Sequence, residues 1–220
     1  MKKKINLSMV LTTIICLLPV ILSVILYSQL PDKIPIHFNI SGQPDNYAAK
    51  FVACFIFPFA FAILNLFVHF MLNSDPKKAN SSETMKTISK WIIPVLSVIC
   101  LPISLFLSLG KNIPVHIIIP ALVGVLILVC GNYLPKNRQN YTVGIKLPWT
   151  LHSEENWNKT HRMAGFLWMI GGAIIIIISF FQFINIAIVL VIVIILTIVP
   201  IIYSYILYRR ELYSDHKNFD

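Results

Sequence analysis

INIAIVLVIVIILTIVPIIYSYILY, residues 184–208, is the stretch of the sequence that decides the fold. It contains no charged side chain. An α-helix rises about 1.5 Å per residue, so about 20 apolar residues cross a hydrocarbon core about 30 Å thick. We therefore predict a transmembrane helix over Ile184–Tyr208.

Five further apolar stretches are long enough to do the same. They are Ile5–Tyr27, Phe51–Leu72, Ile88–Leu109, Ile113–Asn132 and Met163–Phe181. A turn at Gln182–Phe183 is expected before the sixth stretch. The first stretch follows three lysines, as a signal peptide does, but its apolar run is too long and no small-residue cleavage site follows it. The sequence therefore predicts an all-α membrane protein, a bundle of six transmembrane helices that includes the first stretch.

The composition also favours lipid as the solvent of this chain. Of its 220 residues, 57% are hydrophobic and only 12% are charged, whereas soluble domains carry about 25% charged residues. We expect one transmembrane domain over residues 1–220, in contact with a lipid bilayer. The four cysteines lie singly inside apolar runs, so neither a disulfide framework nor a zinc site is indicated, and we predict no metal and no cofactor.

The distribution of Lys and Arg predicts the orientation in the membrane. If the N-terminus is inside, fifteen of the eighteen basic residues fall on the inner side, and only Lys33, Lys50 and Lys111 fall outside. Cytoplasmic loops carry such an excess of basic residues. We therefore predict that both termini are cytoplasmic. The net charge of +9 then reflects topology, and we expect no direct binding of nucleic acid.

One long connection, residues 28–50, is predicted on the outer side. Residues 41–45, SGQPD, are typical of a turn, because Gly permits a positive φ and Pro fixes its own φ at a value that suits turns. Residues 34–40 alternate loosely and are expected to lie extended. Asp32, His37 and Asp45 cluster in this connection, so they are candidates for recognising an extracellular ligand. The alternative is that these three side chains fold the loop.

A second long connection, residues 133–162, is predicted on the inner side. Ser153 can cap a helix that begins with two glutamates, and Glu155 and Lys159 are spaced as an i,i+4 pair. Trp149 and Trp157 are either interfacial anchors or parts of a docking surface for a partner. The histidines and glutamates here do not have the spacing of a metal-hydrolase motif, so we predict no catalytic residues and no enzyme.

The inner connection resembles a known family. Its motif residues are Gly131-Asn132, Asn140, GIKLPWTL at 144–151, Ser153-Glu154-Glu155, Trp157 and KTHR at 159–162. They resemble the signature of the SdpI family of bacterial immunity membrane proteins. The outer connection, through Leu30-Pro31-Asp32, Pro44-Asp45 and residues 47–50, is similar to a small domain of unknown function that often precedes it. The resemblance divides the chain into a helix pair at 1–72 and a four-helix portion at 88–208.

The resemblance implies a function at the bacterial plasma membrane. The family's namesake protects a toxin-producing bacterium against its own secreted toxin peptide and holds an autorepressor at the membrane. It implies a toxin peptide and a cytoplasmic repressor as partners of this chain. The family-specific inner surface would comprise Lys146, Pro148, Trp149, Thr150, Glu155, Trp157 and Arg162. Lys146-Leu147 stands where many relatives have Arg-Thr, and a Lys cannot reproduce bidentate Arg contacts.

A small transporter or permease-like protein is the alternative function. Prolines interrupt most predicted spans, and broken helices line the substrate cavities of many transporters. However, no Asp, Glu, Lys or Arg lies deep in any span, and ion-coupled carriers usually need one. The sequence therefore favours immunity over transport.

Overall fold

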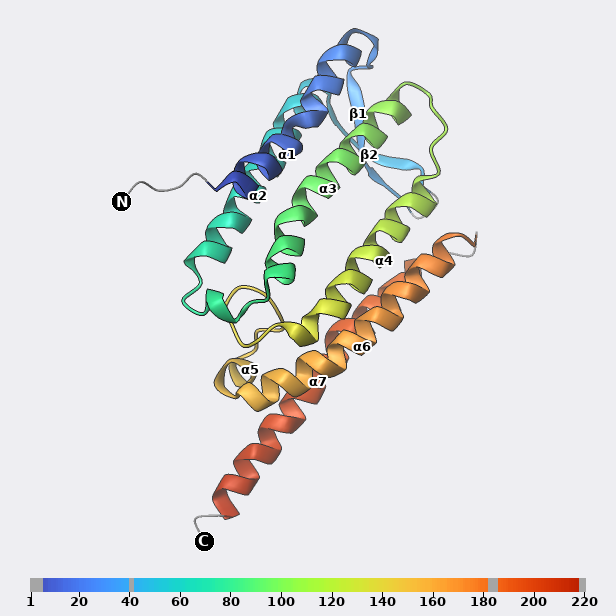
Figure 1. The fold of residues 1–220 in the computed structure, drawn as a ribbon. Helices are drawn as coiled ribbons and strands as arrows, with labels where there is room; N and C mark the ends of the chain where they lie inside the picture. Colours follow the sequence, from blue (N-terminus) through green and yellow to red (C-terminus); the bar gives the residue numbers. More distant parts are fainter. Residues whose placement is uncertain (1–5, 40–41, 182–185, 218–220) are drawn as a thin grey trace, which may run out of the picture. The chain divides into compact units, whose positions relative to one another are not determined.

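The computed structural model describes residues 6–39, 42–181 and 186–217. It is mostly helical, with six helices long and apolar enough to cross a membrane (Figure 1). They are α1 (Leu7–Leu26), α2 (Phe57–Ser74, preceded by a π-helical segment at Val52–Ile56), α3 (Glu83–Ser108), α4 (Val115–Tyr133), α6 (Glu154–Ser179) and α7 (Ile186–Lys217). The six predicted spans are confirmed, while the turn expected at Gln182–Phe183 lies outside the described residues.

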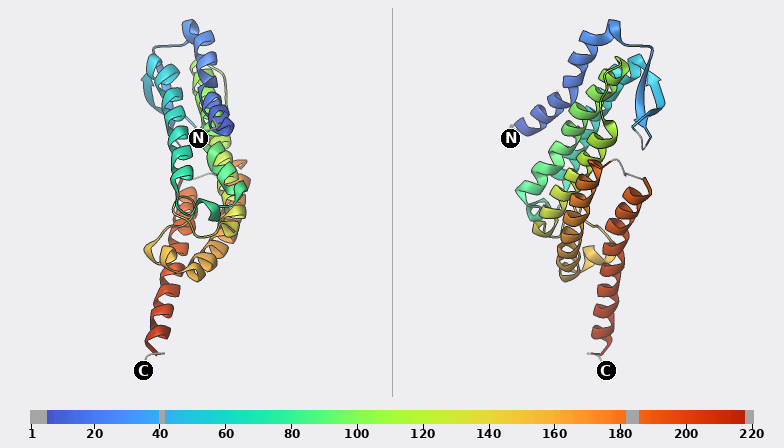
Figure 2. Two further views of the ribbon diagram at one scale, coloured as in Figure 1. Left: turned by 60° about the vertical axis from the view of Figure 1, so that its left-hand side comes forward. Right: turned by 90° about the vertical axis from the view of Figure 1, so that its right-hand side faces the viewer.

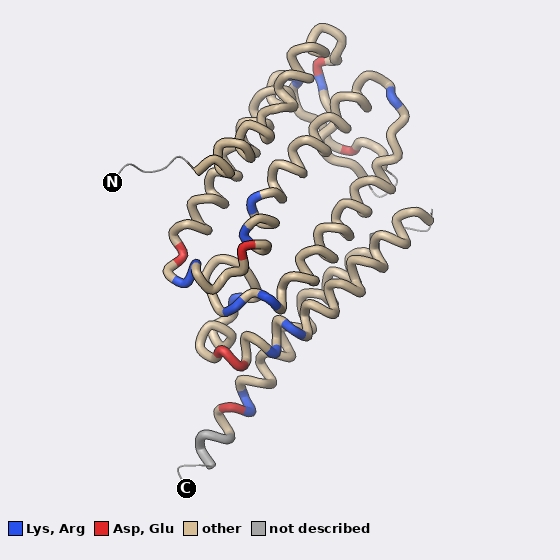
Figure 3. Tube along the Cα trace, in the orientation of Figure 1, with Lys and Arg blue, Asp and Glu red and all other residues tan. Residues whose placement is uncertain are grey.

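Charged residues occupy the ends of these helices and the segments between them (Figure 3). The acidic and basic residues of α3 lie at residues 83–90, those of α6 lie at residues 154–162, and those of α7 follow residue 208. The described parts of α1, α2 and α4 carry none. Long uncharged stretches of helix are what a hydrocarbon core requires.

The chain folds as two compact units. The first comprises residues 1–73 and 87–118, and the second comprises residues 74–86 and 119–220. The predicted outer connection lies in the first unit and the predicted inner connection in the second. The third span groups mainly with the first two in these units. The division implied by the resemblance, a helix pair at 1–72 and a four-helix portion at 88–208, stays a prediction.

Buried polar side chains join the helices of the first unit. Thr12 of α1 lies 2.9 Å from Nε2 of His69 in α2, and the side-chain amide of Asn65 hydrogen-bonds Thr12 at 3.0 Å. Ser97 of α3 donates to the Cys16 carbonyl at 2.8 Å. Hydrogen bonds between spanning helices are worth about 0.6 kcal/mol each on average. They therefore help to fix which helix faces meet.

Glycines set the packing of α4 against α6 in the second unit. A Cβ on Gly172 would lie 2.6 Å from the Leu128 backbone nitrogen, and a Cβ on Gly165 would lie 2.8 Å from the Gly131 carbonyl. Only glycine permits this approach of two backbones. Helices α6 and α7 also lie side by side (Figures 1 and 2), and Trp168 donates from Nε1 to the Leu196 carbonyl at 2.9 Å.

Two further elements lie in the long connections between the spans. A short helix, α5 (Pro148–His152), precedes α6. The outer connection forms an antiparallel hairpin of β1 (Lys33–Phe38) and β2 (Pro44–Ala49). The extended conformation expected from residue 34 onward is therefore confirmed over the described residues, and it belongs to a paired strand.

Candidate functional site

The outer hairpin is closed by a tight turn and held by its own ladder. Gly42 has φ +74°, a conformation that L side chains rarely adopt. A Cβ there would lie 3.0 Å from the His116 backbone nitrogen, so the hairpin tip lies against the start of α4. The strands pair Ile34 with Ala48 and Pro35 with Tyr47, and irregularities follow near His37.

One face of the hairpin is anchored in an apolar cluster. Ile34 is fully buried among Leu30, Ala53, Cys54 and Leu105. Lys50 also holds the end of the hairpin in place, since its Nζ donates to the Leu30 carbonyl at 2.7 Å and lies 4.5 Å from the centre of the Tyr27 ring. Burial of Ile34 fixes the register, because a slip by one residue would turn it to solvent.

The three predicted polar residues are all exposed, two of them within the hairpin strands and Asp32 directly before β1. Asp32 and Asp45 line one open hollow of about 450 Å³. The remaining residues that line it are Lys33, Asn46, Tyr47, Ala48 and Ala49. His37 lies beside Asp45, with its Nδ1 2.5 Å from Oδ1 of Asp45. The structure thus pairs His37 with Asp45, whereas Asp32 lies near the other end of the two strands, where its carbonyl accepts the Lys50 N–H.

A smaller hollow of about 120 Å³ lies beside the buried face of β1. It is lined by Ile34, Ile36, Ala53, Phe57, Phe61, Cys100, Leu101, Ser104 and Leu105. Its lining is mostly apolar, whereas four of the seven residues that line the larger hollow carry a charge or a side-chain amide. The hairpin therefore offers both kinds of surface to a ligand that is itself amphipathic.

The inner segment of the second unit is built around Trp157. This side chain has no exposed area. Its Nε1 donates to the Asn137 carbonyl at 2.8 Å, and its ring stacks on His161 with centroids 3.9 Å apart. The prediction of a surface role therefore does not hold for Trp157. Burial arises because residues 137–147 fold over the ring, and sequence spacing along α6 alone does not reveal that cover.

His161 holds the covering segment in place. Its Nδ1 donates to the Trp157 carbonyl at 2.8 Å, and its Nε2 accepts the Ile145 N–H at 2.9 Å. Gly144, with φ +126°, lies directly against both rings: a Cβ there would be 2.5 Å from Nε2 of His161. Glycine is therefore required at residue 144 for two separate reasons, its backbone conformation and the close approach of the rings.

Thr150 is also buried, and it closes the turn before α5. Its hydroxyl donates to the Ile145 carbonyl at 2.8 Å and accepts the Leu147 N–H at 2.9 Å. The Gln139 amide donates to the carbonyls of Thr150 and Leu151 at 3.0 and 2.9 Å. The surface role predicted for Thr150 is therefore replaced by a role in shaping the segment.

The other predicted inner residues keep some exposure. Trp149 is half-buried, donates from Nε1 to Ser204 Oγ at 2.8 Å, and packs against Tyr205 and Tyr208. Lys146, Pro148, Glu155 and Arg162 are exposed. The predicted cap is confirmed, because Ser153 Oγ accepts the Asn156 N–H at 3.1 Å. The predicted pairing of Glu155 with Lys159 is confirmed at 2.5 Å.

Sequence reasoning missed the polar residues that order the inner segment. Asp75 is nearly buried and accepts hydrogen bonds from the Tyr141 N–H and the Thr142 hydroxyl, at 3.0 and 2.6 Å. Asn140 Oδ1 accepts the N–H groups of Thr142 and Val143. The cluster of Asn and Gln at 137–140 was the available signal, since such side chains often satisfy backbone groups in ordered turns.

These features define a multi-pass membrane protein with two ordered polar segments, an exposed hairpin and a folded segment around a buried tryptophan. Comparison with known sequences identifies the group within that class. The chain belongs to the SdpI family.

Three matches support this assignment. The model of the SdpI/YfhL protein family matches residues 136–204, and that of a domain of unknown function (DUF1648) matches residues 14–62. The chain is 30% identical to the Immunity protein SdpI of Bacillus subtilis (strain 168) over 172 residues, which cover 78% of this chain and 81% of that protein. No solved structure matches. The predicted resemblance is therefore confirmed for both segments.

Proposed function

We propose that this chain is a plasma-membrane immunity protein that protects its cell against a secreted peptide toxin. The observation that carries the proposal is its similarity to Immunity protein SdpI over 81% of that protein. Protection of this kind requires binding and no catalytic group. The transport alternative stays a prediction, since neither hollow of the hairpin gives it particular support.

The proposed orientation places both termini in the cytoplasm and the hairpin outside, because most of the Lys and Arg residues then lie on the cytoplasmic side. A secreted peptide would then meet the hairpin first. Asp32 and Asp45 would supply acceptors for its polar groups, and the small hollow near Ile36 would take an apolar side chain. The proposed toxin contact is therefore this polar and apolar pair of hollows.

The inner segment is proposed to dock a cytoplasmic repressor. Its exposed residues Lys146, Pro148, Glu155 and Arg162 would form the contact, together with half-buried Trp149. The buried ring of Trp157 would hold this surface in shape without touching the repressor. A toxin could control docking only if the protein has two conformations that bind it with different affinities.

Survival of a toxin-sensitive strain tests the proposal. A Bacillus subtilis strain that lacks its own SdpI would express this chain. It would then be exposed to the secreted toxin against which SdpI protects. We expect survival well above that of the empty vector at matched membrane abundance. Equal killing of both strains would reject the proposed function.

A further inference from the structure

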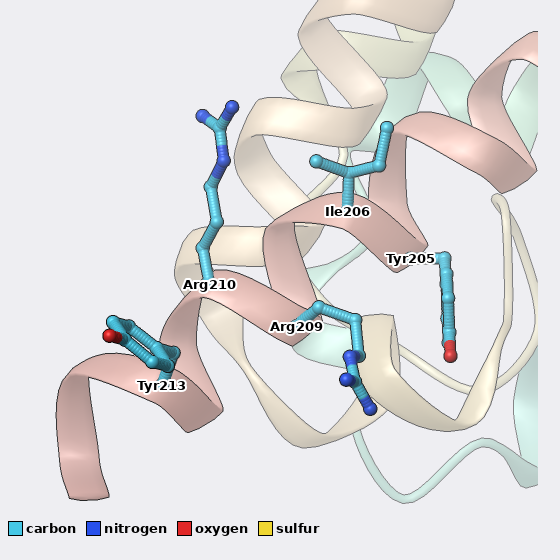
Figure 4. A pocket seen from close by; sticks show the side chains of 5 residues that line it. All are labelled: Tyr205, Ile206, Arg209, Arg210 and Tyr213. Carbon is cyan, nitrogen blue, oxygen red and sulfur yellow. The ribbon is translucent and has the colours of Figure 1, made fainter.

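The end of α7 carries a hollow that neither the family nor the proposed function explains. Five residues line its volume of about 460 Å³: Tyr205, Ile206, Arg209, Arg210 and Tyr213. Tyr205, Arg209 and Tyr213 are spaced four residues apart, as are Ile206 and Arg210, so the five residues form two adjacent rows along α7. Figure 4 shows these five side chains along α7, with Arg210 extending to the same side of the helix as Ile206 and Arg209 to the opposite side, near Tyr205.

The hollow lies where a spanning helix must leave the hydrocarbon. From Ile186 to Tyr208, α7 carries no charged residue. At 1.5 Å per residue this stretch is about 34 Å long, close to the hydrocarbon thickness of about 30 Å. Tyr205 and the neighbouring ring of Trp149 are aromatic types that collect at the headgroup level. The two arginines therefore lie at headgroup depth, whichever side of the membrane that is.

The charge of the hollow is strongly one-sided. Among the described residues that line it, two are arginines and none is acidic. Both arginines are exposed, and neither forms an ion pair with any side chain that the structure describes. The adjacent acid, Glu211, accepts a hydrogen bond from Ser153 Oγ at 3.0 Å. Its carboxylate is thus engaged at the start of α6, outside the hollow.

We propose that this hollow binds the headgroup of an anionic glycerophospholipid. The guanidinium groups of Arg209 and Arg210 extend to opposite sides of α7, so either one would hold the phosphate of a bound lipid, a role that suits Arg better than Lys. The apolar side chain of Ile206 and the ring of Tyr205 would lie against the first part of the acyl chains. The order along α7, apolar before cationic, matches the order of acyl chain and phosphate in such a lipid.

Native mass spectrometry of the full chain in detergent tests this proposal. The probes are a phosphatidylglycerol and a phosphatidylcholine with identical acyl chains, added separately. We expect the wild-type chain to retain phosphatidylglycerol preferentially. In the double variant Arg209→Gln with Arg210→Gln, apparent affinity for phosphatidylglycerol should fall about 30-fold. This figure is what the loss of two basic residues near an anionic surface usually costs in binding. Affinity for phosphatidylcholine should stay unchanged.

A matched control removes the same charge elsewhere. The double variant Lys136→Gln with Arg138→Gln alters two exposed basic residues that do not line the hollow, and it should keep the preference. Equal loss in both double variants would overturn the proposal. So would equal retention of the two lipids by the wild-type chain, a comparison that needs no variant to fold. Displacement of the lipid by millimolar inorganic phosphate would also overturn it, since free phosphate would then be the ligand.

Discussion

Replacing Gly144 with alanine should disrupt the inner segment through two separate costs. The first is conformational, because a non-glycine residue at φ +126° costs about 1–3 kcal/mol. The second is steric. The new Cβ would lie 2.5 Å from Nε2 of His161 and 2.9 Å from the Trp157 ring, and both rings are buried and stacked. If His161 moves, the Ile145 N–H loses its acceptor, at about 1–3 kcal/mol for a buried donor.

The expected loss in the free energy of unfolding is therefore about 2–6 kcal/mol, a large part of the usual total of about 5–15 kcal/mol. Gly110→Ala is the matched control, since Gly110 has φ +75° but a Cβ there would meet nothing within 4 Å. It should cost only about 1–2 kcal/mol. Thermal unfolding in detergent compares the two variants, and hydrogen exchange follows the Ile145 amide. Equal shifts in the unfolding midpoint, with that amide still protected in Gly144→Ala, would refute the reasoning.

Three further predictions concern packing, a hydrogen bond and topology. Gly172→Ala should lower the unfolding midpoint more than Gly171→Ala, because the first Cβ would meet the α4 backbone at 2.6 Å and the second a movable leucine side chain at 2.7 Å. Trp149→Phe keeps the ring contacts but removes the indole hydrogen bond to α7, so stability in the same assay should fall by about 0.5–1.5 kcal/mol. Reporter fusions after Lys50 should read outside and fusions after Arg162 inside; a reproducible outside signal after Arg162 would contradict the proposed topology.

The sequence predicts the six helices because their apolar runs are local features that need no knowledge of partners. The cap by Ser153 and the pairing of Glu155 with Lys159 are local in the same sense, since each depends on neighbours within one helical turn. The hairpin was only partly predictable. Alternation suggested extended chain after residue 34, but its pairing with β2 depends on how Ile34 is buried among residues of α1, the π-helical segment at Val52–Ile56 and α3.

The role of Trp157 depends on contacts distant in sequence. A tryptophan near a membrane end can anchor at the interface, contact a partner or fill a core, and spacing along α6 suits all three. Trp157 is buried because the Asn137 carbonyl accepts its indole N–H and because Gly144 allows residues 137–147 to close over its ring. The need for positive φ at residue 144 is not visible from that residue alone.

We propose that the exposed hairpin provides the contact with a secreted toxin. The direct measurement is survival of the toxin-exposed strain expressing the double variant Asp32→Asn with Asp45→Asn, at the same membrane abundance as the wild-type chain. These side chains are exposed, so the substitutions should cost little stability. We predict that survival falls toward that of the empty vector, while Trp149→Ala leaves survival near the wild-type level. Full protection by the hairpin variant, together with loss of protection in Trp149→Ala, would contradict the account.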